Sequence, residues 1–116
     1  MDLKLANKNI LITGGTGGIG TSIVEHFLEE GSTVICLVRN KEKFEKVKAE
    51  LFAKKVKIEN LHATSCDILD HLSINNSIKS VLNEFERIDV LVNCAGFAPV
   101  MPFSIMSQDE ISAMID

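Results

Sequence analysis

A glycine-rich string between an apolar run and a helical pattern carries the clearest chemistry in this sequence. It reads Thr13-Gly14-Gly15-Thr16-Gly17-Gly18-Ile19-Gly20 and follows the apolar run Asn9–Thr13. Glycines permit a tight turn and let a ligand approach the backbone without meeting a Cβ atom. A helix beginning near Gly18 would direct free N–H groups and the positive end of its dipole at that space. We predict that residues 14–20 bind a pyrophosphate; the alternative is an ordinary turn.

A basic residue follows the second apolar run. Thr33–Val38 leads into Arg39-Asn40, where dinucleotide-binding sheets usually carry an Asp or Glu that binds the adenosine ribose. An arginine forms charge-assisted hydrogen bonds to a 2′-phosphate, which a carboxylate would repel. We therefore predict that Arg39 and Asn40 contact the cofactor and that NADP(H) is preferred over NAD(H). The alternative is a surface arginine at the start of a helix.

Polar and small residues also follow the third and fourth apolar runs. Asp67 comes after a weaker run within residues 58–65, and Asn93-Cys94-Ala95-Gly96 closes the segment that begins at Ile88. Ligands of open α/β sheets bind outside the carboxyl ends of the strands. We predict that Asp67 accepts a hydrogen bond from the adenine amino group, with a turn or helix-cap aspartate as the alternative. The Asn93 amide can tie neighbouring strands, and the small residues after it let the chain pass close to a flat ring.

The elements that must position these residues alternate between strands and helices. Apolar residues recur at helical spacing within residues 19–28, 44–52 and 74–85, and Gly31 stands where the first helix should end. This alternation predicts an α/β fold, a doubly wound parallel sheet of strand order 3-2-1-4 in a three-layer α/β/α arrangement. Ser107-Gln108-Asp109-Glu110 has the spacing of a capping box and predicts a fourth helix.

The end of the chain follows closely on that fourth helix start. We expect residues 1–116 to be one dinucleotide-binding domain that is truncated within the fourth helix. The edge of the fourth strand would then expose unpaired backbone groups and promote association. The methionine-containing segment 101–106 is expected either to border a substrate pocket or to be a loop that packs on the core.

Composition and charge exclude several other classes of protein. Hydrophobic residues make up 46% and charged residues 24% of the chain, which is typical of a globular domain. No apolar run approaches the ~18 residues of a membrane-spanning helix, and no signal peptide is visible. The three cysteines lack Cys-x-x-Cys spacing, so we expect reduced, buried or half-buried thiols and a cytoplasmic location.

Nucleic-acid and metal binding are not expected either. Residues 1–58 hold ten Lys and Arg against seven Asp and Glu, and residues 59–116 hold two against nine. Glutamates are interleaved through the basic stretch 41–57 and no aromatic residues accompany its cations in a stacking pattern, so it is interpreted as a solvated helix face. The three histidines lie on different predicted elements, without zinc-ligand spacing.

Together these motifs resemble the short-chain dehydrogenase/reductase family, over its N-terminal half. The family motif Thr-Gly-x-x-x-Gly-x-Gly is matched by Thr13, Gly14, Gly18 and Gly20, and residues 93–96 resemble the short-form Asn-Asn-Ala-Gly signature with Cys94 in place of the second Asn. The resemblance implies that Asp67 and Ile68 hold the adenine and that Asn93, Ala95 and Gly96 border a cofactor ribose. It also places Arg39 where NADP-preferring members carry a basic residue.

The residues that the family uses for catalysis are missing. Members carry an Asn in the fourth helix, a Ser after the fifth strand and a Tyr-x-x-x-Lys pair, whereas this chain contains no tyrosine. The resemblance implies the cofactor-binding part of an NADP(H)-dependent oxidoreductase acting on a small carbonyl or alcohol, as a homo-oligomer. The chain alone is predicted to have no catalytic residue and no activity. The alternative is a complete, non-catalytic dinucleotide-binding module or assembly partner.

Overall fold

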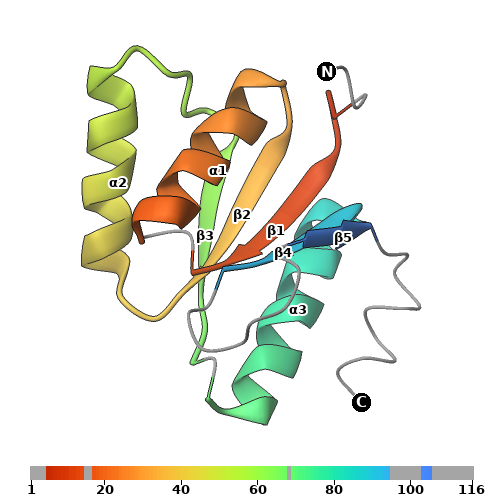
Figure 1. Ribbon diagram of the computed structural model, residues 1–116. Coiled ribbons are helices and arrows are strands. Elements are labelled where there is room, and N and C mark those ends of the chain that lie inside the picture. Colours follow the sequence, from red (N-terminus) through yellow and green to blue (C-terminus); the bar gives the residue numbers. More distant parts are fainter. Residues whose placement is uncertain (1–4, 15–16, 68, 95–102, 106–116) are drawn as a thin grey trace.

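Four parallel strands form the centre of the molecule. The computed structural model describes residues 5–14, 17–67, 69–94 and 103–105. The strands are β1 (Asn9–Thr13), β2 (Thr33–Val38), β3 (Leu61–Ser65) and β4 (Val90–Asn93), and they pair in the order β3-β2-β1-β4 (Figure 1). The predicted strand order is confirmed.

Three helices cover the two faces of this sheet. Helices α1 (Gly18–Glu29) and α2 (Lys41–Ala53) lie on one face, and α3 (His71–Phe85) lies on the other (Figure 1). The crossovers between parallel strands place each helix back on the sheet, as right-handed β-α-β connections do. The described elements therefore form the predicted three-layer α/β/α arrangement.

The strands are apolar on both faces because each face is covered. Residues at alternate positions of β1 and β2, such as Ile10 and Val34, belong to the core beneath α1 and α2. Their neighbours Leu11 and Ile35 belong to the core beneath α3. All four side chains are fully buried. This continuous apolar pattern is typical of parallel strands between two helical layers.

The helix ends follow the capping chemistry of their residues. Gly31 adopts φ +86° directly after the α1 C-cap, a left-handed conformation that glycine adopts without a Cβ penalty. The carboxylate of Asp70 caps α3 by accepting a hydrogen bond from the Leu72 N–H at 3.0 Å. One expected apolar position differs, because Phe52 near the end of α2 is 68% exposed. The buried stripe of α2 consists of Phe44, Val47 and Leu51.

The fourth strand is shorter than its apolar pattern, because residues before Val90 are used in a connection. Ile88 is buried in the core beneath α3, and the Asp89 carboxylate accepts a hydrogen bond from the Asn9 N–H at 2.8 Å. The Asn9 side-chain amide donates to the Phe85 and Arg87 carbonyls at 3.1 and 2.9 Å. These bonds fasten the start of β1 to the connection between α3 and β4.

The expectation of a bare edge on β4 is wrong. Strand β5 (Phe103–Ile105) pairs antiparallel with β4, with Leu91 opposite Ser104. Phenylalanine and isoleucine favour an extended backbone, and the pairing supplies hydrogen-bond partners to the outer groups of β4. Part of segment 101–106 is therefore a strand. The predicted fourth helix at residues 107–116 lies outside the described residues.

The burial of the cysteines agrees with the expectation. Cys36 and Cys66 are buried free thiols, and Cys94 is a half-buried free thiol. Within the described ranges, no helix is long and apolar enough to cross a membrane.

Candidate cofactor-binding site

The segments predicted to bind a cofactor lie at one edge of the sheet. Thr13 is level with Leu37 of β2 and with Asn93 of β4, and Val38 is level with Ser65 of β3. Because these strands are parallel, the residues that follow them leave the sheet at the same edge. The turn after β1, Arg39, Asp67 and Asn93 are thereby brought to the carboxyl edge, as the sequence predicts.

The turn after β1 is made by a glycine in the left-handed region. Gly14 has φ +73°, and its carbonyl accepts a hydrogen bond from the Gly17 N–H at 3.4 Å. A non-glycine residue at such a φ would cost about 1–2 kcal/mol. Gly15 and Thr16 lie outside the described residues. The backbone conformation at position 14 therefore favours glycine.

The amino end of α1 is left open by its own residues. Gly17 is the N-cap and contributes no side-chain hydrogen bond, and the first turn contains no acidic residue. The N–H of Thr21 bonds to the Gly17 carbonyl at 2.8 Å, which begins the helical ladder. The earlier N–H groups of the helix belong to the set that has no intrahelical partner. Such an end attracts an anion through its N–H groups and its dipole.

Described residues do not fill the space beside this helix start. Among them, a Cβ atom built on Gly18 meets no atom within 4 Å, and one built on Gly17 meets only the Gly14 carbonyl oxygen at 3.9 Å. Packing against the described part of the chain therefore does not demand glycine at these two positions. Gly20, in the first turn, is buried. The Ile19 backbone lies in the same turn.

A side-chain hydrogen bond joins the carboxyl ends of β1 and β4. The Thr13 hydroxyl donates to the Asn93 amide oxygen at 2.9 Å, and the Cys94 N–H donates to the Thr13 carbonyl at the same distance. The predicted role of the Asn93 amide in tying neighbouring strands is confirmed. These bonds fix the point where the glycine turn leaves the sheet. Ala95 and Gly96 lie outside the described residues.

Arg39 and Asn40 have different surroundings. Arg39 is exposed, and no described residue forms a hydrogen bond or ion pair with its guanidinium. Asn40 is the N-cap of α2, and its side-chain oxygen accepts hydrogen bonds from the Glu42 and Lys43 N–H groups at 2.8 and 3.4 Å. The Asn40 oxygen thus already has a structural role, whereas the Arg39 charge is available to an anion.

Asp67 lies in a tight local turn before α3. One carboxylate oxygen accepts a hydrogen bond from the Leu69 N–H at 3.0 Å, and the Asp67 carbonyl accepts one from the Asp70 N–H at 3.0 Å. The Asp67 N–H donates to the Ser73 hydroxyl oxygen at 2.9 Å. The turn interpretation of Asp67 is therefore correct for one carboxylate oxygen. Ile68 lies outside the described residues.

Ser73 is a positioning residue that the sequence did not single out. Its hydroxyl, from the first turn of α3, holds the backbone of Asp67. The only sequence signal is a serine three residues after the helix cap Asp70, which is also common in helices without such a contact.

Two of the three cysteines near this edge, Cys36 and Cys94, have protonated thiols at neutral pH. Burial raises the pKa of Cys36 to about 12, and the nearby Cys94 thiol contributes to the rise. Burial also raises the pKa of Cys94. Because the thiolate is the nucleophilic form, neither cysteine is activated for covalent chemistry. The described part of the site thus offers contacts for an anion, and these two thiols supply no activated nucleophile.

Comparison with known proteins assigns the family. The model of the family described as short chain dehydrogenase matches residues 8–116. The chain is 37% identical over 107 residues to the 3-oxoacyl-(acyl-carrier-protein) reductase FabG of Aquifex aeolicus, covering 92% of this chain and 42% of that one. The fold and the carboxyl-edge arrangement are those of a nucleotide-binding α/β protein. The chain belongs to the short-chain dehydrogenase family.

Solved structures agree with this assignment. The N-domain of a bacterial malonyl-CoA reductase, determined with NADP, matches with a TM-score of 0.73 and 35% identity, over 82% of this chain and 18% of that one. A xylitol dehydrogenase bound to NAD+ matches with a TM-score of 0.70 and 32% identity, over 81% of this chain and 35% of that one. The chain spans about two fifths of the length of the Aquifex aeolicus reductase. The resemblance to the N-terminal half of the family is confirmed.

Proposed function

We propose that this chain is the NADP(H)-binding part of an oxidoreductase that interconverts a small carbonyl compound and its alcohol. The observation that carries the proposal is the open start of α1 behind the Gly14 turn. It combines a left-handed glycine, an N-cap without a side-chain partner and empty space beside Gly18. A pyrophosphate fits this combination because it accepts hydrogen bonds and carries negative charge where the backbone can be approached closely.

Each predicted contact has a place in this proposal. The backbone of residues 14–20 would hold the pyrophosphate, and Arg39 would pair with a 2′-phosphate on the adenosine ribose. The second carboxylate oxygen of Asp67, together with the Ile68 backbone, would hold the adenine. Asn93, Ala95 and Gly96 would border a ribose, and Asn40 would act by starting α2 beside Arg39. The bound nicotinamide would supply the hydride.

The proposed preference for NADP(H) over NAD(H) depends on Arg39. Its exposed guanidinium lies beyond β2 and has no ion pair with a described carboxylate. Titrating the chain with NADPH and NADH by isothermal calorimetry should give tighter binding of NADPH. Arg39→Asp should reverse that order, because its carboxylate repels a 2′-phosphate and accepts hydrogen bonds from ribose hydroxyls. Equal binding of both cofactors by the parent chain would refute the preference.

Catalysis is proposed to require residues that this chain lacks. No tyrosine is available to donate a proton to a carbonyl oxygen. The 116-residue chain should therefore bind NADPH without oxidising it when simple ketones and aldehydes are added. Substrate-dependent loss of NADPH absorbance, beyond the rate without protein, would contradict the proposed division between binding and catalysis.

The second candidate function is a dinucleotide-binding module that takes part in no catalysis, alone or with another segment. Strand β5 favours it, because the pairing with β4 covers an edge that would otherwise be bare. The two candidates differ in what completes the activity. Adding a chain that carries a Tyr-x-x-x-Lys segment of the family should restore turnover only if the first candidate holds.

A further inference from the structure

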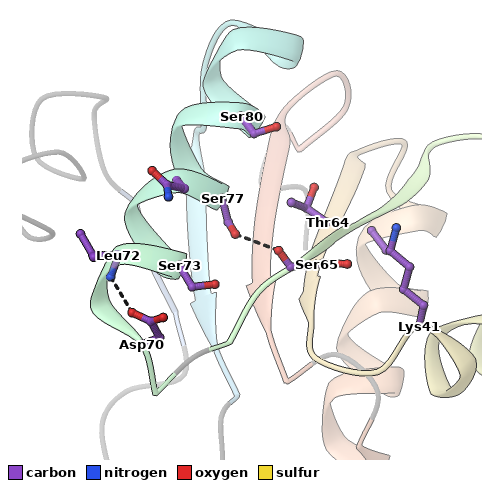
Figure 2. A pocket seen from close by; sticks show the side chains of 10 residues that line it. Lys41, Thr64, Ser65, Asp70, Leu72, Ser73, Ser77 and Ser80 are labelled. Atoms are coloured by element: carbon purple, nitrogen blue, oxygen red, sulfur yellow. Dashed lines mark hydrogen bonds between the residues drawn. The ribbon is translucent and has the colours of Figure 1, made fainter.

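A groove follows the outer edge of β3, and its end at Ser73 adjoins the Asp67 turn of the predicted cofactor site. One cavity of about 630 Å³ is lined by Ala63, Thr64 and Ser65 of β3 together with residues of α3. A second of about 270 Å³ is lined by residues 61–64 of β3 together with residues of both α2 and α3. Lys41, Ala63 and Thr64 line both cavities, so the two form one groove along the whole strand. Figure 2 shows the larger cavity, with Ser73, Ser77 and Ser80 on α3 and Lys41 opposite.

The hydrogen-bond register shows which backbone groups face this groove. The Val34 N–H bonds to the Asn60 carbonyl, and the Cys66 N–H bonds to the Val38 carbonyl. Because backbone groups alternate along a strand, the even-numbered residues from 60 to 66 face β2. The N–H and C=O groups of Leu61, Ala63 and Ser65 therefore point outward, since β3 is the last strand on this side of the described sheet.

Only part of this outward set is satisfied. The Leu61 N–H donates to the Ile58 carbonyl at 3.1 Å, and the Ser65 carbonyl accepts from the Ser77 hydroxyl at 2.9 Å. Among the described residues, nothing bonds to the Leu61 carbonyl, to either backbone group of Ala63, or to the Ser65 N–H. In an added parallel strand, two residues at positions i and i+2 would form hydrogen bonds with all four of these groups. In an added antiparallel strand, three residues would do so.

The walls of the groove carry unlike charges. The α2 wall presents Lys41 and Lys48 with Glu45, and the α3 wall presents Asp70 and Glu84 with no cation. The two ion pairs that the described residues form, Lys54–Glu25 and Arg87–Asp89, involve none of these side chains. An added strand directs successive side chains to opposite faces, toward α2 and toward α3 in turn.

We propose that the outer edge of β3 binds an extended polypeptide segment of alternating charge, acidic toward α2 and basic toward α3, as an added strand. Main-chain hydrogen bonds would provide the affinity and the two charged walls would select the partner. A second copy of this chain is a poorer occupant. In a second copy, β3 is bordered by α2 and α3, whose side chains would meet the same side chains of the first copy. A single extended segment has no helices beside it.

The test uses the full chain and a capped synthetic peptide, Thr-Glu-Lys-Val-Lys-Glu-Thr, whose glutamates share one face and whose lysines share the other. In ¹⁵N-labelled protein, the peptide should shift the Ala63 and Ser65 amide resonances and slow their hydrogen exchange. Two N-methylated peptides, each blocked at one alternate set of amides, form the backbone control. Methylation of the amides that face β3 should abolish binding, and methylation of the other amides should leave binding intact. The reason is that only alternate amides of an added strand face its neighbour.

Protein variants test the same surface from the other side. Ala63→Pro removes an N–H that points outward, and an edge strand accepts proline at such a position. Lys48→Glu reverses one charge of the α2 wall. Each should weaken peptide binding by about tenfold or more. Lys46→Glu makes the same charge change on α2 outside the groove and should leave binding unchanged. Thermal melting and NADPH titration show whether each variant is folded.

Several results would overturn the proposal. No binding at millimolar peptide excludes it, as does equal binding of both methylated peptides. Full affinity of a folded Ala63→Pro variant would mean that the peptide occupies another surface. Protection of the Ala63 and Ser65 amides in a dimer without peptide would assign the edge to a second copy of the chain. If Ala63→Pro fails to fold, the methylated peptides and Lys48→Glu show whether the peptide binds at the outer edge of β3.

Discussion

Substitution of Gly18 by alanine separates the cofactor-binding role of the glycine turn from a role in folding. An added Cβ meets no atom of the described residues within 4 Å, so we expect the methyl group to cause no clash in the free protein. Alanine is favoured over glycine inside a helix by about 1 kcal/mol, and Gly18 is the first residue of α1. The free energy of unfolding should therefore stay the same or rise by up to about 1 kcal/mol.

The same methyl group should weaken cofactor binding, because it fills the space proposed for the pyrophosphate. We expect NADPH affinity to fall by about tenfold or more, which corresponds to about 1.4 kcal/mol. Urea denaturation measures the stability, and isothermal calorimetry measures the binding. Ser22→Ala, one turn later in α1, is the matched control and should leave binding unchanged.

A contrasting variant sharpens this prediction. Gly14→Ala places a Cβ at φ +73°, so it should lower the free energy of unfolding by about 1–2 kcal/mol. The reasoning fails if Gly18→Ala binds NADPH as tightly as the parent chain. It also fails if Gly18→Ala is destabilised as much as Gly14→Ala, because the added methyl group would then clash with another part of the protein.

Three further predictions concern stability. Glu86 has φ +72° after α3, so Glu86→Gly should raise the free energy of unfolding by about 1 kcal/mol in urea denaturation, and an unchanged or lower value would contradict the strain at this residue. Asn40→Ala removes the N-cap of α2 and should cost about 1 kcal/mol by the same assay, whereas Asn40→Asp should retain most of the stability. The Cys36 pKa is raised from 9.0 to about 12 in the folded state, so the unfolded chain loses this proton first and stability should fall as pH rises from about 9 to 12. Cys36→Ala should flatten most of that decline in a pH series of melts, and an equally steep decline would assign it to other groups.

Local patterns were sufficient to predict the parallel layers. Strands β1 and β2 have the bounds of their apolar runs, and Gly31 ends α1 with a positive φ. The reason is physical: a strand buried on both faces needs an unbroken apolar run, and a left-handed residue favours glycine. The carboxyl-edge placement of Arg39 and Asp67 then followed from the direction of the strands.

Other features depended on contacts between residues far apart in the chain. The carboxylate of Asp89 bonds to Asn9, eighty positions away, and no local pattern indicates that partner. Asp67 was predicted to have either a ligand role or a turn role, and only the tertiary structure shows that one carboxylate oxygen accepts a hydrogen bond within a turn. Asn40 was predicted to contact the cofactor, and the structure shows that its side chain caps α2.

The sequence by itself determined the order of strands and helices, the glycine turn between β1 and α1, and the family. These features rest on residues that are near one another in the chain, where periodicity and backbone preference act directly. Only the tertiary structure decided that β5 pairs antiparallel with β4 and that the outward backbone groups of Ala63 have no described partner. Strand edges are satisfied by whichever segment reaches them in space, and sequence spacing does not specify that partner.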